Sequence, residues 1–139
     1  MSGGNHSLGK IIRFVRAEDK RGLCFGGWPS DILGIYLSWH MSNGSLVIIE
    51  EEGNLVALAI GTQMHEGDLD KHWQAWDEQG DSIYLSDIVA TTKRGVAACV
   101  DELANRCPNW KELKLFAVRH GKRRRFNPEV LERAMVAWS

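Results

Sequence analysis

The sequence predicts an α+β domain of α/β-like character, with a mixed, mostly antiparallel sheet and flanking helices. Two β-branched runs, Ser45–Glu51 and Leu55–Gln63, are joined by Glu52-Gly53-Asn54, which is typical of an antiparallel hairpin. Residues 82–119 contain a strand pattern, a helix pattern and a second strand pattern, which is the order of a right-handed parallel crossover. Helical periodicity precedes the hairpin and returns at the C-terminal end.

The N-terminal part of the chain predicts a tail, a strand and a connection. Residues 1–9 are rich in Gly, Ser and Asn and are expected to form a flexible tail, which leaves residues 10–139 as a single domain. Ile11–Arg16 alternates enough to predict a first strand. Gly22–Gly27 predicts a glycine-rich connection to the next element.

A helix is predicted to start at Pro29-Ser30-Asp31. Ser30 is the expected N-cap, because a serine hydroxyl accepts a hydrogen bond from the amides of a first helical turn. The helix is expected to end near Asn43-Gly44. Its apolar face is predicted to contain Ile32, Ile35, Tyr36 and Trp39.

The second half of the chain contains the predicted crossover. Met64–Gly80 is acidic and polar and predicts a long loop or an irregular helix, and Ser82–Ala90 predicts a strand. Thr91-Thr92 can cap the following helix, which Cys107-Pro108 ends because proline disfavours a helical residue before it. Leu113–Val118 predicts the parallel partner strand. The apolar positions of the helix are Val96, Val100, Leu103 and Cys107.

The chain ends with a basic run and a last helix. Gly121–Arg125 is read as a short basic stretch before that helix. Asn127 is the expected N-cap, and Pro128 suits the first helical position because its missing N–H would have no partner there. The apolar face is predicted to contain Leu131, Ala134, Met135 and Trp138.

The composition is that of a soluble globular protein. The chain has 139 residues, 44% hydrophobic and 25% charged, and is long enough to bury a core. No stretch has the length and apolarity of a membrane span, and the N-terminal residues lack the apolar segment of a signal peptide. The three cysteines have no framework spacing and are expected to be reduced thiols, which favours a cytoplasmic location.

Charge is segregated along the chain, although the formal net charge is only −1. Residues 50–81 contain nine acidic residues and one lysine, whereas residues 111–125 contain seven basic residues and one glutamate. This pattern predicts self-compensating surface charge or a partner of defined sign. The run Lys122–Arg125 fits a solvated surface, nucleic acid phosphates or the acidic surface of an acyl carrier protein. Nucleic acid is disfavoured, because the net charge is negative and aromatic residues are not interleaved.

Asp87 is the first candidate for catalysis, because it stands in an apolar strand and a buried carboxylate needs a partner or a role. It can act as a general base that takes a proton from an attacking amine, or it can pair outward with a basic residue of a neighbouring strand. His40, beside Trp39, is the second candidate, with a capping or surface role as the alternative. No metal site is predicted, because the spacing of His65 and His72 matches no ligand signature.

The order of elements, with a basic glycine turn after the fourth strand, resembles the GNAT acyltransferase superfamily. The corresponding loop of that family reads Gln/Arg-x-x-Gly-x-Gly/Ala, and Thr92–Ala97 matches its Gly and Ala but has Thr at the first position. The resemblance implies that amides at the helix start hold the phosphates of an acyl-coenzyme A or acyl-carrier-protein donor, without a metal. The implied donor-binding residues are Lys93, Arg94, Gly95, Val96 and Ala97. The backbone N–H groups of Ile88 and Val89 are expected to polarise the thioester carbonyl if the strand bulges there.

Within this superfamily, the chain is most similar to the RTX toxin-activating lysine acyltransferases. Three stretches carry the similarity, namely Trp28-Pro29, Leu55–Ala59 and Tyr84–Ala90, and the last one implies that the catalytic aspartate of that family falls on Asp87. Two features depart from the pattern. The histidine that precedes the family's Trp-Pro pair has no counterpart in Leu23–Gly27, and the two terminal strands of the usual GNAT fold have no counterpart in this sequence.

These observations leave three functions open. The first is an N-acyltransferase that moves an acyl group from a thioester donor to an amine, above all to a lysine of a protein substrate. The second is a catalytically inactive GNAT-shaped module that binds a protein partner or a like subunit. The third is a small nucleic-acid-binding protein that uses Arg13, Arg16 and the run Lys122–Arg125.

Overall fold

The computed structural model describes residues 8–19, 25, 28–71, 73–119 and 122–139. Short 3₁₀ turns occur at Glu66–Asp68 and Trp110–Glu112. In chain order, the helices and strands are α1 (Leu8–Glu18), α2 (Ser30–Ser42), β1 (Leu46–Glu51), β2 (Asn54–Met64), β3 (Ser82–Ala90), α3 (Lys93–Arg106), β4 (Lys114–Arg119), β5 (Lys122–Phe126) and α4 (Pro128–Trp138).

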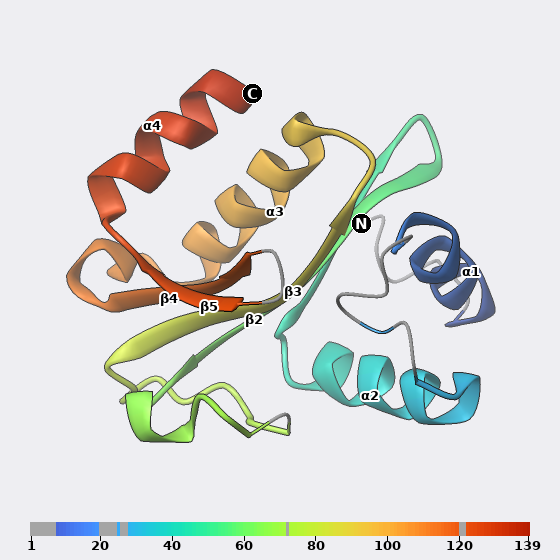
Figure 1. Cartoon of the computed structure of the whole chain (residues 1–139), viewed down its shortest axis with the longest axis horizontal. Helices are drawn as coiled ribbons and strands as arrows, with labels where there is room; N and C mark the ends of the chain where they lie inside the picture. Colours follow the sequence, from blue (N-terminus) through green and yellow to red (C-terminus); the bar gives the residue numbers. More distant parts are fainter. Residues whose placement is uncertain (1–7, 20–24, 26–27, 72, 120–121) are drawn as a thin grey trace.

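The strands form one central sheet that has helices on both faces (Figure 1). The strand order is β1-β2-β3-β4-β5, and every neighbouring pair is antiparallel except β3 and β4. Those two strands are parallel and are connected through α3. α1 and α2 lie on one face of the sheet, and α3 and α4 lie on the other (Figure 1). The predicted fold class, a mostly antiparallel α+β sheet with flanking helices, is confirmed.

Each face of the sheet buries its own apolar layer. On the first face, Val15 of α1 and Leu37 of α2 pack with Leu58 of β2 and are fully buried. On the second face, Cys99 of α3 packs against Ala59 of β2. Because β2 contributes side chains to both layers, it is the most completely buried strand, as expected for a strand near the centre of a covered sheet.

The predicted first strand, Ile11–Arg16, is wrong, because these residues belong to α1. Ile11 and Val15 lie one helical turn apart and are fully buried. Residues at this spacing lie on one face of a helix. Burial of that face against a neighbouring element stabilises the helix and outweighs the preference of β-branched residues for strands. The predicted tail is also wrong for Leu8 and Gly9, which begin α1. Residues 1–7 and most of the predicted connection Gly22–Gly27 lie outside the described residues.

α2 has the predicted extent but a different buried face. Pro29, rather than the predicted Ser30, is the N-cap, and it provides no side-chain hydrogen bond. Of the predicted face only Tyr36 is fully covered, whereas Ile32 and Ile35 are 43% and 59% exposed. The buried side of the helix is instead formed by Leu33, Gly34, Tyr36, Leu37 and His40. Because this side of α2 is the buried one, His40 faces the sheet.

The hairpin and the last strand are defined by local geometry. The β1–β2 turn consists of Glu52 and Gly53, whose φ angles of 54° and 83° are both left-handed. Two such residues match the twist of the strands that they connect. The basic run Lys122–Arg125 is exposed, and together with Phe126 it forms the edge strand β5, with Arg125 opposite Phe116 of β4. Basic side chains are a common way to protect an edge strand from further pairing.

The connection between β2 and β3 is long and mostly irregular, as the sequence predicts. The side chain of Gln63 is buried and donates hydrogen bonds to the carbonyl oxygens of Glu78 and Gly80, which ties the end of the connection to β2. Among the described helices, none has the length and apolarity that a membrane span requires.

Candidate active site at the bulge of β3

β3 contains a bulge at the position where Asp87 was expected to lie. Asp87 is opposite Ile60 of β2, but the next β2 residue, Gly61, is opposite Leu85. Ser86 therefore has no partner of its own in the register. A bulge of this kind places two successive residues on one side of the strand. Ser86 and Asp87 consequently both line a cavity with α2 residues, and Leu85 lines a cavity under α3.

Gly61 has a steric reason to be a glycine. A Cβ atom added at Gly61 would lie only 2.5 Å from Cδ1 of Leu103, a buried residue of α3. The backbone of β2 thus approaches α3 closely at the bulge, as is common for a glycine inside a strand. The bulge is held by this packing on one face and by α2 on the other.

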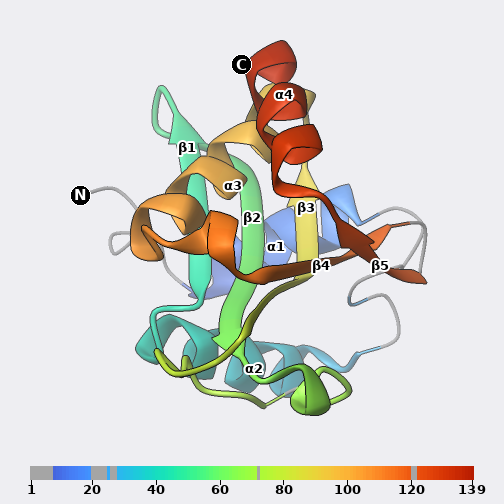
Figure 2. The ribbon, with the colours of Figure 1, turned by 90° about the vertical axis from the view of Figure 1, so that its left-hand side faces the viewer.

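β3 and β4 diverge next to the bulge. Their parallel pairing extends from Ser82 and Lys114 to Leu85 and Ala117, while β3 continues to Ala90. β4 and β5 turn strongly away from the direction of the first three strands (Figure 2). Asp87 is therefore positioned on β3 just beyond the last residue pair that this strand forms with β4.

Asp87 accepts hydrogen bonds from two hydroxyl groups. Its Oδ2 atom lies 2.9 Å from Oγ of Ser86 and 3.3 Å from the hydroxyl oxygen of Tyr36. Tyr36 is 1% exposed, and burial together with the negative charge of Asp87 raises the pKa of its hydroxyl group. Tyr36 thus remains a hydrogen-bond donor to the carboxylate at neutral pH. Asp87 is half-buried and lines the cavity on the α2 side of the sheet.

His40 lies in the same region. Its side chain is only 2% exposed, so the alternative of a surface histidine is wrong. Its Nδ1 atom is 2.6 Å from Oγ of Ser45, and the Ser45 hydroxyl also lies 3.2 Å from the carbonyl oxygen of His40. If the hydroxyl donates to this carbonyl, Nδ1 carries the proton that is donated to Oγ, and Nε2 is the acceptor nitrogen of the ring. Tyr36 packs edge-on against the His40 ring, with 4.5 Å between centroids.

Both predicted catalytic residues line one cavity of about 300 Å³. They are far apart in the sequence, and Tyr36 connects them, because it contacts the ring of His40 and donates to Asp87. Trp73, from the long connection, packs edge-on against Tyr36 at 5.1 Å. The cavity thus combines a carboxylate, an imidazole and a phenol, which are groups that commonly transfer protons.

Charged side chains line the outer part of this cavity. Arg123 of β5 forms an ion pair with Asp70 at 2.6 Å, and Lys71 pairs with Asp68 at 2.9 Å. Tyr84 also lines the cavity, and burial raises the pKa of its hydroxyl group. The contribution of Arg123 to this cavity was missed in the sequence, because the basic run was interpreted as a solvated surface or a binding surface.

The start of α3 has the predicted cap. Oγ1 of Thr92 accepts a hydrogen bond from the amide of Gly95 at 3.0 Å. Gly95 is buried, and an added Cβ would lie 3.2 Å from Cβ of Ala57, so packing on β2 accounts for this glycine. Arg94 forms an ion pair with Glu51 at 2.7 Å.

The residues predicted to bind the donor do not gather at one place. Lys93 and Arg94 are exposed at the helix start, whereas Ala97 is 4% exposed and faces the core. Val96 and Ile88 line the cavity under α3, and Val89 packs in the layer under α1 and α2. The bulge that was expected near Ile88 and Val89 is present slightly earlier, at Ser86.

The remaining candidates have other surroundings. His65 pairs with Asp77 at 3.1 Å, and His72 lies outside the described residues. Within the part of the chain that the structure describes, no three His, Cys, Asp or Glu side chains are arranged to hold a metal ion. Burial raises the pKa of the Cys99 thiol to about 12, which makes it a poor nucleophile.

In comparisons of the sequence, no protein-family model and no curated protein matches this chain. A function for the protein is therefore inferred from the residues that line its cavities and from their geometry.

Proposed function

We propose that the protein transfers an acyl group from a thioester donor to an amine, with a protein lysine as the acceptor. The observation that carries the proposal is the cavity that brings Asp87, His40 and Tyr36 together beside the diverging strands β3 and β4. The crossover from β3 through α3 to the parallel β4 was expected from the sequence pattern, but the strand before α3 is the third rather than the fourth, because Ile11–Arg16 is helical.

The proposed reaction requires a base near the amine. In acyl transfer, the amine nitrogen attacks the thioester carbonyl carbon, the C–N bond forms, the C–S bond breaks, and the proton of the amine must be removed. Asp87 takes this proton, directly or through a water molecule, and passes it on to the sulfur, which leaves as a thiol. Tyr36 orients the carboxylate by its hydrogen bond to Oδ2. His40 lines the same cavity, and in the tautomer with the proton on Nδ1 its Nε2 atom can accept a proton.

The donor is proposed to be acyl-coenzyme A or an acyl carrier protein, with its phosphate at the start of α3. The first amides of a helix lack partners within the helix and favour an anion. Lys93 is exposed there and adds positive charge, whereas Arg94 would first have to release Glu51. The basic strand β5 would attract the acidic surface of a carrier protein.

Donor binding can be tested by thermal unfolding with acetyl-coenzyme A, coenzyme A and octanoyl-coenzyme A in large excess. A donor at about one hundred times its dissociation constant stabilises the fold by about 2.7 kcal/mol, which raises the melting temperature by several degrees. The Lys93→Glu variant should lose most of this increase. Arg133→Glu, the same charge change at an exposed position of α4, should retain it. An unchanged melting temperature with every donor would contradict the proposal.

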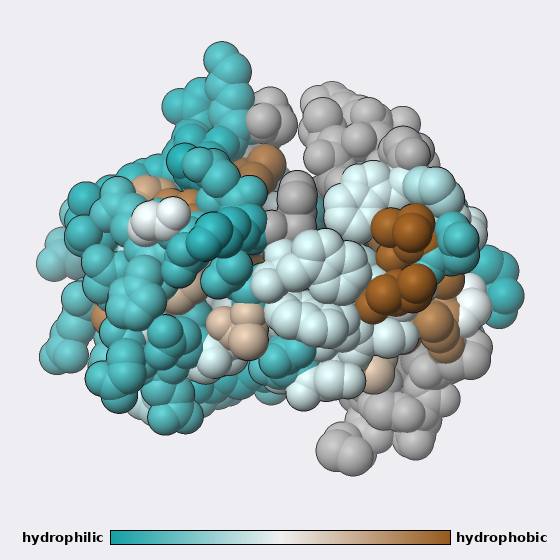
Figure 3. Space-filling view, turned by 90° about the horizontal axis from the view of Figure 1, so that it is seen from below, coloured by the Kyte–Doolittle hydropathy of each residue, from teal (hydrophilic) through white to brown (hydrophobic). Residues whose placement is uncertain are grey.

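A second candidate function, a binding module without catalysis, is favoured by one observation. Ile32 and Ile35 lie one helical turn apart on the outer side of α2 and are 43% and 59% exposed. An apolar patch is visible over α2 (Figure 3). Contiguous exposed apolar surface often marks a protein interface. Sedimentation of wild type and Ile35→Lys at increasing concentration tests it, because self-association that Ile35→Lys removes would support the module.

A further inference from the structure

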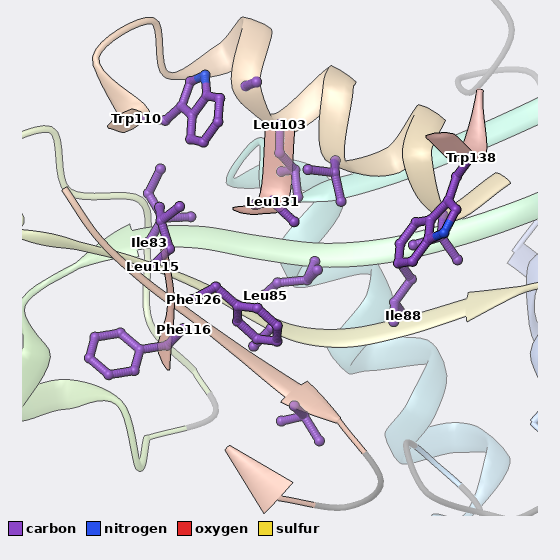
Figure 4. Close-up of a pocket in the computed structure, with 15 residues that line it drawn as sticks. Ile83, Leu85, Ile88, Leu103, Trp110, Leu115, Phe116, Phe126, Leu131 and Trp138 are labelled. Carbon is purple, nitrogen blue, oxygen red and sulfur yellow. The ribbon is translucent and has the colours of Figure 1, made fainter. Parts of the chain in front are cut away.

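A second cavity, of about 210 Å³, lies on the other face of the sheet, under α3 and α4 (Figure 4). All of the side chains that line it are aliphatic or aromatic. The cavity is partly open to solvent, and water inside it would lack hydrogen-bond partners, because the lining side chains carry almost no polar groups. The chemistry of the lining therefore selects an apolar ligand.

The cavity is elongated. Along β3 it is lined from Ile83 to Ile88, which is roughly 16 Å at the usual rise of a strand. Along α3 it is lined from Val96 to Ala104, which is about 12 Å at the rise of a helix. Trp110 and Trp138 lie toward opposite ends (Figure 4). This shape fits an extended chain better than a compact ring system.

The volume of the cavity limits the number of carbon atoms that a bound hydrocarbon chain can have. A dry apolar cavity of about 150 Å³ holds a benzene molecule, which has six carbon atoms. A cavity of about 210 Å³ is larger by two fifths and therefore takes a chain on the order of eight carbon atoms.

The two cavities meet at one strand. Val118 of β4 lines both the apolar cavity and the cavity that contains Asp87. Val118 follows Ala117, the last β4 residue that is paired with β3, so both cavities adjoin the place where the strands diverge. A chain that fills the apolar cavity can thus present its end near Asp87, on the other face of the sheet.

We propose that this cavity binds the straight hydrocarbon chain of the acyl donor, with a chain of about eight carbons as the preferred length. The identification of the chain as part of a donor rests on the proposed function, whereas the selection of an apolar chain rests on the cavity alone. Each methylene group buried in the cavity should tighten binding about fourfold, up to the length that fills it.

The binding test uses straight-chain alcohols from 1-butanol to 1-decanol, which need neither a thioester nor a phosphate site. Binding is followed by NMR through the methyl signals of Val100, Leu103 and Leu131, which line the cavity. The affinity should rise about fourfold per carbon and level off near 1-octanol. Absence of shifts in these methyl signals, or an affinity independent of chain length, would overturn the proposal.

Two variants of the lining should move the preferred length in opposite directions. Ala104→Leu fills part of the cavity and should weaken 1-octanol binding at least tenfold, whereas Ala98→Leu adds the same atoms to α3 outside the lining and should change it less than twofold. Leu131→Ala enlarges the cavity and should shift the preference to longer alcohols. If Ala104→Leu fails to fold, Leu131→Ala still decides. Identical chain-length profiles in wild type and Leu131→Ala would overturn the proposal.

The role of the chain is tested with acyl donors. A higher rate of transfer from octanoyl-coenzyme A than from acetyl-coenzyme A, with the difference lost in Ala104→Leu, would support the role as a donor site. Alcohol binding without transfer from any donor would support the cavity as a site for an apolar chain. It would overturn both the assignment of that chain to an acyl donor and the proposed function. Transfer from acetyl-coenzyme A without alcohol binding would overturn the cavity proposal and leave the proposed function standing.

Discussion

Gly61→Ala is expected to lower the free energy of unfolding, because it fills the space between the β2 backbone and α3. The new Cβ would lie 2.5 Å from Cδ1 and 3.0 Å from Cδ2 of Leu103. Leu103 is only 6% exposed and lines the apolar cavity, so its methyl groups can relieve the clash only by moving into that cavity. Overpacking of this kind costs about 1–3 kcal/mol, and replacement of glycine returns about 0.4–1 kcal/mol through the unfolded chain. The expected net loss is about 1–2 kcal/mol.

Urea denaturation measures this loss, and a second variant identifies its cause. Gly67→Ala is the matched control, because no atom lies within 4 Å of a Cβ at Gly67, and its stability should change by less than about 0.5 kcal/mol. Leu103→Ala alone should cost about 2–5 kcal/mol, but together with Gly61→Ala the two losses should sum to less, because the clash is gone. Additive losses, or a Gly61→Ala variant as stable as wild type, would refute the close approach at the bulge.

Two further predictions follow from the hydrogen bond to Asp87 and from the buried thiol. Tyr36→Phe should lower the free energy of unfolding by about 1–3 kcal/mol, because it leaves Asp87 with one hydroxyl donor fewer; unchanged stability in urea would mean that this bond contributes nothing. The free energy of unfolding should fall above pH 9, since the unfolded thiol of Cys99 loses its proton there while the native thiol keeps it until about pH 12. The free energy of unfolding should fall by at most about 1.4 kcal/mol per pH unit from this thiol, and Cys99→Ala should remove that contribution. An identical dependence on pH in wild type and Cys99→Ala would contradict the prediction.

The central part of the fold could be predicted because its signals are local. The strand Ser82–Ala90 and the cap at Thr92 are encoded by neighbouring residues and agree with the structure. Ile11–Arg16 was mistaken for a strand because β-branched residues satisfy either structure, and only packing against α2 decides between them. The buried face of α2 was also missed, because the helix is apolar on most of its circumference and periodicity cannot select a side.

The site could be predicted only in part. Asp87 was selected as a candidate because an acid within an apolar strand is unusual, and in the structure it lines the same cavity as His40. Ser86 and Tyr36 were missed, since a bulge in β3 and the rotation of α2 have no signature in a single sequence. Tyr36 lies one helical turn before His40, and this spacing was the only signal that could have linked them.

The central claim is that Asp87 removes the proton from the attacking amine. The most direct measurement is the rate of transfer from octanoyl-coenzyme A to lysine-containing peptides, followed by mass spectrometry, for wild type, Asp87→Asn and Asp101→Asn. Asp101 is exposed on α3 and provides the same chemical change away from the cavity. We predict a loss of at least one hundredfold for Asp87→Asn, in line with the usual contribution of a general base, and no change for Asp101→Asn. Equal rates for the two variants, with both folded, would contradict the role of Asp87.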